Sequence, residues 1–305
     1  MTYQLDVRFE PLYELIGSLH TYICRKSHKK IDLAPEWAQE TRKRLSPELN
    51  SLLDGMEIDA DWKCAYLLVY LCPDASSGER FLAWLEGLTP GALYELLSPY
   101  TSQFPENMSR FRTRILTLFS LWNEEYFLKL DPVVLQSLIK EKEQLRDRLP
   151  AQDAVEFADQ ATNGLWFEPA DGMEKLILVP QYHFQPINVI YNFGSATLCH
   201  YAARIYPDDD GFISPHDYRV LRSLGEKSRL KILQYLHQGP RSFTEIVRYL
   251  KLSKGITHDH LFKLRGAGLI HAHFERDTLT VYSLRLSALG RIQESLLSYI
   301  TKEPV

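Results

Sequence analysis

The sequence predicts a mostly helical α+β chain in two parts, an N-terminal α+β domain and a smaller C-terminal module of helices that ends in a hairpin. Apolar residues recur at helical spacing through most of the first 163 residues and at strand spacing between 175 and 205. A turn-rich segment follows, and the charge balance differs on its two sides. A chain of 305 residues with 45% hydrophobic content is long enough for two domains.

The segment YPDDDGFISP at 206–215 marks the division between the two parts. It combines two prolines, a glycine and three successive aspartates, and no periodic apolar pattern crosses it. A calcium loop would need alternating ligands instead of a contiguous block. We therefore expect an N-terminal domain at 1–206, a linker at 207–214, a compact module at 215–285 and an amphipathic helix at 286–305.

The N-terminal part has helical patterns first and strand patterns later. Residues 3–9 alternate as in a strand, and Pro11 opens a helix. All five tryptophans lie in this part, where they indicate either an aromatic-lined pocket or large core side chains. The expected helices lie near 11–23, 35–53, 59–71, 77–87, 90–98, 106–130, 131–148 and 152–163, and the expected strands near 175–184, 187–193 and 197–205.

Compartment signals favour a cytoplasmic protein with no membrane partner. The start MTYQLDVRFEP lacks the basic region and apolar core of a signal peptide. The longest strongly apolar run, CAYLLVYLC at 64–72, is about half the length of a membrane span. The cysteines form no CxxC pair, so reduced thiols are the simplest interpretation. They are Cys24, Cys64, Cys72 and Cys199.

Charge is distributed unequally along the chain. Residues 215–285 hold 13 Lys and Arg against 6 Asp and Glu, whereas residues 1–214 hold 20 against 31. Six of the ten histidines also fall in 215–285. A cationic module on an acidic body suggests a polyanionic partner for the module, and a chance surplus on a solvated surface is the alternative.

The C-terminal module has the pattern of three helices, a tight turn between the last two, and a hairpin. This order describes a winged helix-turn-helix. The hairpin is predicted by the alternation of IHAHFERDTLTVYSL at 270–284. The helix signals are Pro215, the cap Ser228, the stop Gly239-Pro240, the capping box from Ser242 to Glu245, and the turn at 251–253.

These residues also carry a resemblance. LGEKSRLKILQYL, LSKGITHDHLFKLRGAGLI and the hairpin ending VYSL resemble the winged-helix domain of the ArsR family of bacterial repressors. The resemblance covers roughly 215–285 and implies a DNA-binding transcriptional regulator. Two departures matter: FTEIVRYL has no cysteine, so the family's metal chemistry is not carried over, and Asp259 stands where the family often has a basic or imidazole side chain. The longer layout resembles family members that have a large N-terminal domain.

The segment LSKGITHDHLFKLRGAGLI is the expected recognition helix. At helical spacing Thr257, Leu261 and Leu264 share a core-facing stripe, and the opposite side points outward. His258 and His260 then do not converge, so HDH is a reading face and not a metal site. The expected DNA contacts are Arg229, Ser242, Ser253, Lys254, Ile256, His258, Asp259, Phe262, Lys263 and, at the wing tip, Arg276.

Other chemical groupings are weaker. His20, Cys24 and His28 lie at i, i+4 and i+8, too far apart along a helix for all three to bind one ion. His183, His200, Glu168 and Asp171 occur in the β-rich section and could line a pocket. No nucleophile elbow and no phosphate-binding glycine loop occurs. We therefore expect no enzymatic activity, no catalytic residue, no metal and no cofactor.

The last helical pattern, at 286–300, has an apolar stripe that can pack on its own domain or on a second copy. We expect a homodimer in which Leu289, Ile292 and Leu296 take part, because helix-turn-helix proteins commonly pair to read two half-sites. The sequence thus predicts a sequence-specific regulator of double-stranded DNA, a repressor by resemblance, with a possible small-molecule effector in the N-terminal domain. The alternatives are a protein-interaction adaptor, or an N-terminal enzyme with a regulatory appendage.

Overall fold

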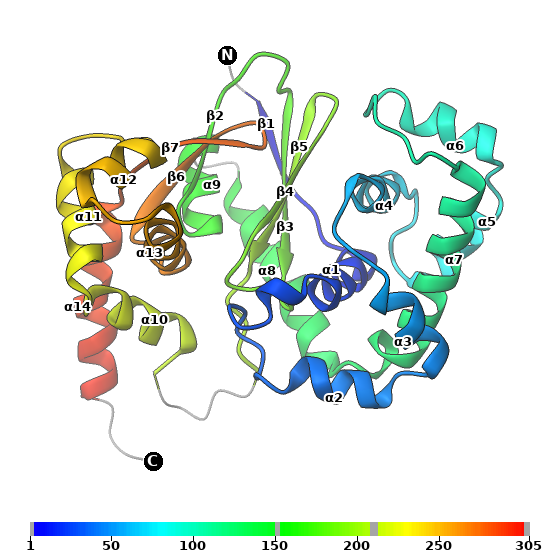
Figure 1. Cartoon of the computed structure of the whole chain (residues 1–305), viewed down its shortest axis with the longest axis horizontal. Coiled ribbons are helices and arrows are strands. Elements are labelled where there is room, and N and C mark those ends of the chain that lie inside the picture. The colour runs from blue at the N-terminus through cyan, green and yellow to red at the C-terminus, as the bar shows by residue number, and fades with distance from the viewer. Residues whose placement is uncertain (1–2, 150–152, 208–212, 302–305) are drawn as a thin grey trace. The chain divides into compact units, whose positions relative to one another are not determined.

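The computed structural model describes residues 3–149, 153–207 and 213–301. The chain forms two compact units (Figure 1). The N-terminal unit comprises Gln4–Asp147 and Glu174–Ile205, and the C-terminal unit comprises Met1–Tyr3, Arg148–Met173 and Tyr206–Val305.

The unit boundaries differ from the domain boundaries expected from the sequence. Residues 148–173, expected in the N-terminal domain, belong to the C-terminal unit. The reason is backbone pairing: strand β2 (Leu165–Glu168) lies parallel to strand β6 (Ile270–Glu275), with Leu165 opposite Ala272. Residues 208–212 of the expected linker lie outside the described residues.

The N-terminal unit has a four-stranded sheet of order β1-β3-β5-β4. β1, β3 and β5 are mutually parallel, and β4 pairs antiparallel with β5 as a hairpin. β3 and β5 are buried along almost their whole length, as expected of central strands. The bounds are β1 Gln4–Val7, β3 Lys175–Gln181, β4 Val189–Phe193 and β5 Ala196–Ala202.

Helix α1 (Pro11–Ile23) is the core helix of this unit, because every residue from Leu12 to Ile23 is buried. The helical pattern expected at 35–53 forms two helices, because Ser46 caps a new helix that has Pro47 at its first position. The remaining helices are α2 Trp37–Arg44, α3 Pro47–Asp54, α4 Ala60–Leu71, α5 Gly78–Glu86, α6 Pro90–Leu97, α7 Met108–Glu125 and α8 Pro132–Arg148, with short 3-10 turns at Arg25–Ser27 (η1) and Phe127–Lys129 (η2).

The C-terminal unit is a winged helix-turn-helix with an extra helix and strand. Its sheet has the order β2-β6-β7, so the hairpin of β6 and β7 is extended by a strand from more than 100 residues earlier in the chain. The Tyr3 hydroxyl donates to the carbonyl of Phe167 in that added strand. The other elements are α9 Ala154–Thr162, α10 Pro215–Leu224, α11 Lys227–His237, α12 Phe243–Leu250, α13 Lys254–Gly266, β7 Thr278–Leu284 and α14 Leu286–Ile300.

None of the helices within residues 3–149, 153–207 and 213–301 has the length and apolar character needed to span a bilayer.

Candidate nucleic-acid interface

Helices α12 and α13 form the helix-turn-helix, and local side-chain contacts set its geometry. The backbone N–H of Ser242 donates to Glu245 Oε2 at 2.8 Å, and the N–H of Glu245 donates back to Ser242 Oγ, which completes the capping box. α12 ends at Lys251 in the left-handed conformation, with φ of 56°. Ser253 then caps α13 by accepting from the N–H of Ile256. The turn between the helices therefore has both ends fixed.

The inward side of α13 is the expected one. Thr257, Leu261 and Leu264 are all buried, which confirms the predicted core stripe. The outward side exposes Lys254 and His258, and Ile256 retains half of its accessible surface. α13 thus presents a convex, solvent-exposed face of the kind that enters a major groove.

The HDH triplet does not gather around one point. His258 is exposed, its ring edge-on to Phe243. His260 is largely buried, with Nδ1 3.6 Å from Oε2 of Glu226. Asp259 Oδ2 accepts from Lys263 Nζ at 2.7 Å, one helical turn away. The pairing of Asp259 with a neighbouring cation occurs within the free protein.

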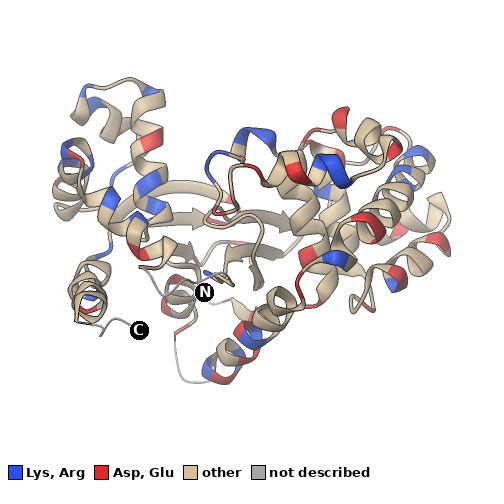
Figure 2. Ribbon diagram, turned by 90° about the horizontal axis from the view of Figure 1, so that it is seen from below, with Lys and Arg blue, Asp and Glu red and all other residues tan. Residues whose placement is uncertain are grey.

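The surface of α11, α12 and α13 is strongly cationic. Residues 227–266 contain nine Lys and Arg but only two Asp and Glu, and the basic positions are spread over these helices (Figure 2). Several of the basic side chains are exposed: Lys227, Lys231, Arg248, Lys251, Lys254 and Lys263. Such a surface attracts a polyanion.

Arg229, one of the predicted DNA contacts, has partners within its own chain. Its side chain is buried, and its guanidinium donates to the carbonyls of Ser223 at 2.7 Å and Arg222 at 2.8 Å. These are carbonyls that the end of α10 leaves without helical partners. In the free protein the guanidinium of Arg229 therefore links α11 to the end of α10.

Three other predicted contacts have local partners. Ser242 and Ser253 act as helix caps, and the Ser242 hydroxyl also donates to Glu245. The Phe262 ring lies under the guanidinium of Arg265, 5.9 Å from its centre. The caps still place backbone N–H groups at helix starts, where phosphates commonly bind.

The wing tip is less cationic than the helices. Arg276 occupies the turn between β6 and β7 with φ of 59°, and the carboxylates of Glu275 and Asp277 stand on either side of it in the chain. Both acidic residues are exposed. Arg276 is therefore one positive charge beside two negative ones at the place expected to contact the DNA backbone.

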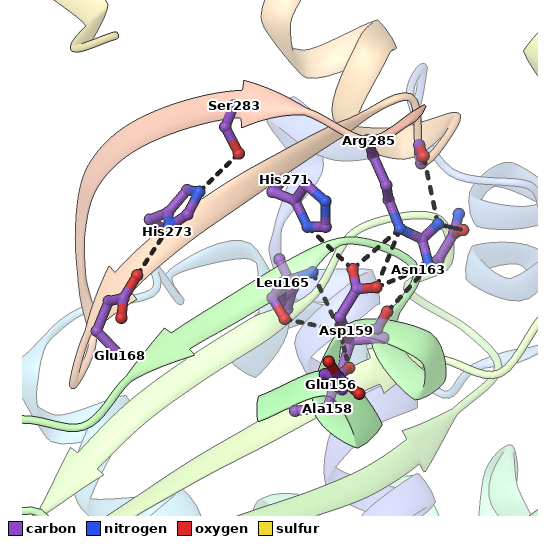
Figure 3. A network of polar contacts seen from close by, with 12 residues as sticks. Glu156, Ala158, Asp159, Asn163, Leu165, Glu168, His271, His273, Ser283 and Arg285 are labelled. Carbon is purple, nitrogen blue, oxygen red and sulfur yellow. Dashed lines mark hydrogen bonds and ion pairs between the residues drawn. The ribbon is translucent and has the colours of Figure 1, made fainter. Parts of the chain in front are cut away.

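A buried polar network joins α9 to β6 and to the start of α14 (Figure 3). It was not predicted from the sequence. Arg285 Nε lies 2.9 Å from Asp159 Oδ1, and its guanidinium also donates to the side chain of Asn163. His271 Nδ1 lies 3.1 Å from the same Asp159 oxygen. Burial raises the pKa of the Asp159 carboxyl, but contact with His271 and Arg285 lowers this pKa by a larger amount. The pKa is therefore below its ordinary value.

A second contact in Figure 3 joins the strands themselves. His273 on β6 pairs through Nδ1 with Glu168 Oε1 of β2 at 3.0 Å and through Nε2 with Ser283 Oγ of β7 at 2.8 Å. One imidazole thus connects all three strands of the sheet. The one local signal for this arrangement was the turn dipeptide Asn163-Gly164 before β2.

The pocket-like residues expected in the β-rich section do not form one site. His183 and His200 lie in the N-terminal unit, whereas Glu168 and Asp171 lie in the C-terminal unit. The three residues at i, i+4 and i+8 also have separate surroundings, because α1 ends at Ile23. His20 accepts from the indole of Trp62, Cys24 contacts Ser27, and His28 contacts the carbonyls of Thr21 and Tyr22.

Helix α14 packs partly on its own unit. Ile292 and Leu296 line a small hollow with Val220 and Leu221 of α10, so these two predicted dimer contacts face an intrachain neighbour. Leu289 is half-buried. The most exposed apolar side chains of the helix are Leu286, Leu297 and Ile300.

Comparison with known proteins agrees with this geometry. Residues 226–272, which include α11, α12 and α13, match the family described as bacterial regulatory protein, arsR family. No curated protein and no solved structure matches the chain. The C-terminal part of the chain therefore carries an arsR-family helix-turn-helix, which makes the protein a DNA-binding transcription regulator.

Proposed function

We propose that the protein is a sequence-specific repressor that binds double-stranded DNA as a homodimer, with α13 in the major groove. The observation that carries the proposal is the exposed cationic face of a well-capped α13 within a complete helix-turn-helix. Repression follows if the bound dimer excludes the polymerase from a promoter. The proposal assigns the protein no enzymatic activity.

Base recognition is assigned to the first half of α13. Lys254 and His258 are exposed there and can donate to guanine or to phosphate. Asp259 can accept from a cytosine amino group if it exchanges its Lys263 partner for the base. Affinity for the DNA phosphate backbone is assigned to the exposed lysines and arginines of α11 to α13, with about four to six phosphate contacts per subunit.

The wing has a smaller role in this proposal. Arg276 can contact the adjacent backbone, but Glu275 and Asp277 beside it oppose the approach of a phosphate. The charge pattern supports a larger contribution of the helices to the binding free energy, with Arg276 contributing mainly to orientation.

Dimerisation is assigned to the outward stripe of α14. Leu286, Leu297 and Ile300 fall on one side of the helix and are each more than half exposed. Gly290, on the same side, has open space where a side chain would lie. A second copy of α14 can approach closely along this stripe.

The experiment is enrichment of genomic fragments by the full-length protein, followed by affinity measurement on an enriched site at several salt concentrations. We expect affinity to fall by on the order of a thousandfold over a fourfold increase in salt, because a dimer releases many counterions. Lys254→Gln should reduce the salt slope by about one per subunit. Lys43→Gln, an exposed lysine of the N-terminal unit, is the matched control and should not change it.

Two outcomes would overturn the proposal. Recovery of no DNA, together with capture of a protein by the C-terminal unit, would favour the adaptor alternative. DNA binding that is independent of salt and of Lys254 would remove α13 from the interface.

A further inference from the structure

A pocket of about 280 Å³ lies at the surface of the N-terminal unit, between α2 and the chain that links α7 to α8. This volume is just below the range of about 300–1,000 Å³ that drug-sized ligands occupy, so it fits a smaller molecule. The residues that carry the argument are Trp37 and Arg44 from α2, and Tyr126, Lys129 and Asp131 from the link.

Two aromatic rings form one wall of the pocket. The rings of Trp37 and Tyr126 meet edge to face, with centres 6.1 Å apart. Tyr126 is also stacked on Trp122, which is fully buried, at 4.5 Å. The wall is therefore backed by the core of the unit and has a fixed shape.

The polar atoms of Trp37 and Tyr126 form hydrogen bonds within the protein and not with the pocket. The indole N–H of Trp37 can only donate, so the Tyr126 oxygen accepts it at 2.9 Å. The Tyr126 hydroxyl is also hydrogen-bonded to His183 Nε2, at 2.8 Å. Burial raises the pKa of Tyr126 above its ordinary value, which keeps this phenol protonated.

The chain of donors ends at a buried carboxylate. His183 Nδ1 lies 2.6 Å from Glu14 Oε1, and the backbone N–H groups of Tyr182 and His183 also donate to Glu14. The Glu14 side chain is fully buried. The indole N–H of Trp37 and the hydroxyl of Tyr126 are used in the hydrogen bonds that lead to this carboxylate. The two residues therefore offer the pocket their apolar ring surfaces.

Charged side chains of both signs line the rim of the pocket. The carboxylates already have partners: Glu40 with Lys43 Nζ, Glu125 with the N–H of Ser46, and Asp131 with the N–H of Val133. The side chains of Arg44 and Lys129 form no hydrogen bond or ion pair with any residue in the described part of the chain. Arg44 and Lys129 are thus the charged side chains of this rim that have no partner in the described part of the chain.

We propose that this pocket binds a small organic carboxylate, whose flat apolar part lies against Trp37 and Tyr126 and whose carboxylate is held by Arg44 and Lys129. An arginine fork matches a carboxylate in geometry as well as in charge. This binding activity goes beyond DNA recognition and involves residues of the N-terminal unit alone. Any effect of the ligand on DNA binding would rest on the proposed function, but the binding itself does not.

The test is calorimetric titration of the full-length protein with benzoate and phenylacetate, and with benzamide and benzylamine as the neutral and cationic counterparts. We expect the two carboxylates to bind with a Kd of about 1 mM or lower, and the other two compounds to bind at least about tenfold more weakly. Trp37 lies in the wall, so its fluorescence should change on binding, and Trp37→Phe should remove that change.

Variants test the two basic side chains of the rim. Arg44→Gln and Lys129→Gln should each weaken carboxylate binding about tenfold, because a charge-assisted hydrogen bond is lost. Arg110→Gln, an exposed arginine on α7 that does not line the pocket, is the matched control. Circular dichroism checks that each variant is folded. Failure of both carboxylates to bind, equal binding of benzamide or benzylamine, or equal loss in the Arg110 variant would overturn the proposal, whatever the result with DNA.

Discussion

Arg285, at the start of α14, and Asp159, in α9, form a buried ion pair between residues 126 positions apart in the chain. Their side chains are 1% and 11% exposed. The pair joins α9 to the turn that follows β7, and β2, which follows α9, lies against the wing. A segment from the middle of the chain is thereby an integral part of the DNA-binding unit.

Removing the Asp159 charge should destabilise the C-terminal unit strongly. We expect Asp159→Asn to lower the free energy of unfolding by about 3–5 kcal/mol, because it leaves Arg285 buried without a counter-charge. Urea unfolding followed by circular dichroism measures this. Asp54→Asn, which breaks the exposed pair with Arg42, is the control and should have a much smaller effect.

The double variant Asp159→Leu with Arg285→Met tests the mechanism. Apolar residues of similar volume should recover most of the lost stability. Replacing both members of a buried ion pair leaves no charge without a counter-charge, whereas replacing one member does. The opposite result is a double variant that loses as much stability as Asp159→Leu and Arg285→Met lose in total when each is made alone. That result would show that the hydrogen bonds to Asn163 and nearby carbonyls matter more than the charge pair.

The helix-turn-helix could be predicted from sequence because its signals are local. The capping box at Ser242, the turn at 251–253 and the stop at Gly239 each act within one helical turn. The stripe of Thr257, Leu261 and Leu264 needed only helical periodicity. Features of this kind are set by residues a few positions apart.

The features that the sequence did not predict depend on distant contacts. The pairing of β2 with β6 joins residues more than 100 positions apart, and no local pattern specifies that partner. Arg229 has the spacing of a surface cation, and only the position of α10 shows that its guanidinium meets the carbonyls of Arg222 and Ser223. The pocket beside Trp37 likewise depends on how α2 meets the end of α7.

Two buried histidines should make the N-terminal unit sensitive to acid. Burial lowers the pKa of His20 and of His200 from 6.5 to about 3 in the folded chain. Below pH 6.5 the unfolded chain binds protons that the folded chain does not, so stability is lost as the pH falls from 6.5 toward 3. Each histidine should contribute a slope of about 1.4 kcal/mol per pH unit in this window.

His200→Phe tests this slope. Neither ring nitrogen of His200 has a hydrogen-bond partner among the described residues, so the substitution removes a titrating group without breaking a hydrogen bond. We expect the difference in unfolding free energy between pH 6.5 and pH 4.5 to be smaller in the variant than in the unmodified protein. His237→Gln, at an exposed position, should leave that difference unchanged. Equal pH profiles for all three proteins would contradict the assignment.

Asp259 should affect base preference and general affinity in opposite ways. Asp259→Ala removes a carboxylate that phosphates repel and releases Lys263 from its ion pair, so affinity for random DNA should stay equal or rise. Preference at one C·G pair per half-site should weaken by about 1–3 kcal/mol. Selection from a random DNA library measures both. Unchanged base preference would show that Asp259 only pairs with Lys263 and does not read a base.

The two sides of α14 should respond differently to substitution. Ile292 is partly buried against α10 of its own chain, so Ile292→Ala should lower the free energy of unfolding and affect association only through stability. Leu297 is 52% exposed and lies on the outward stripe, so Leu297→Glu should leave the unfolding midpoint of the isolated chain nearly unchanged. In a dimer it would bury a carboxylate against an apolar neighbour, which should weaken association by at least about tenfold in sedimentation experiments. An unchanged dimer in the Leu297 variant would place the contact between copies on another surface.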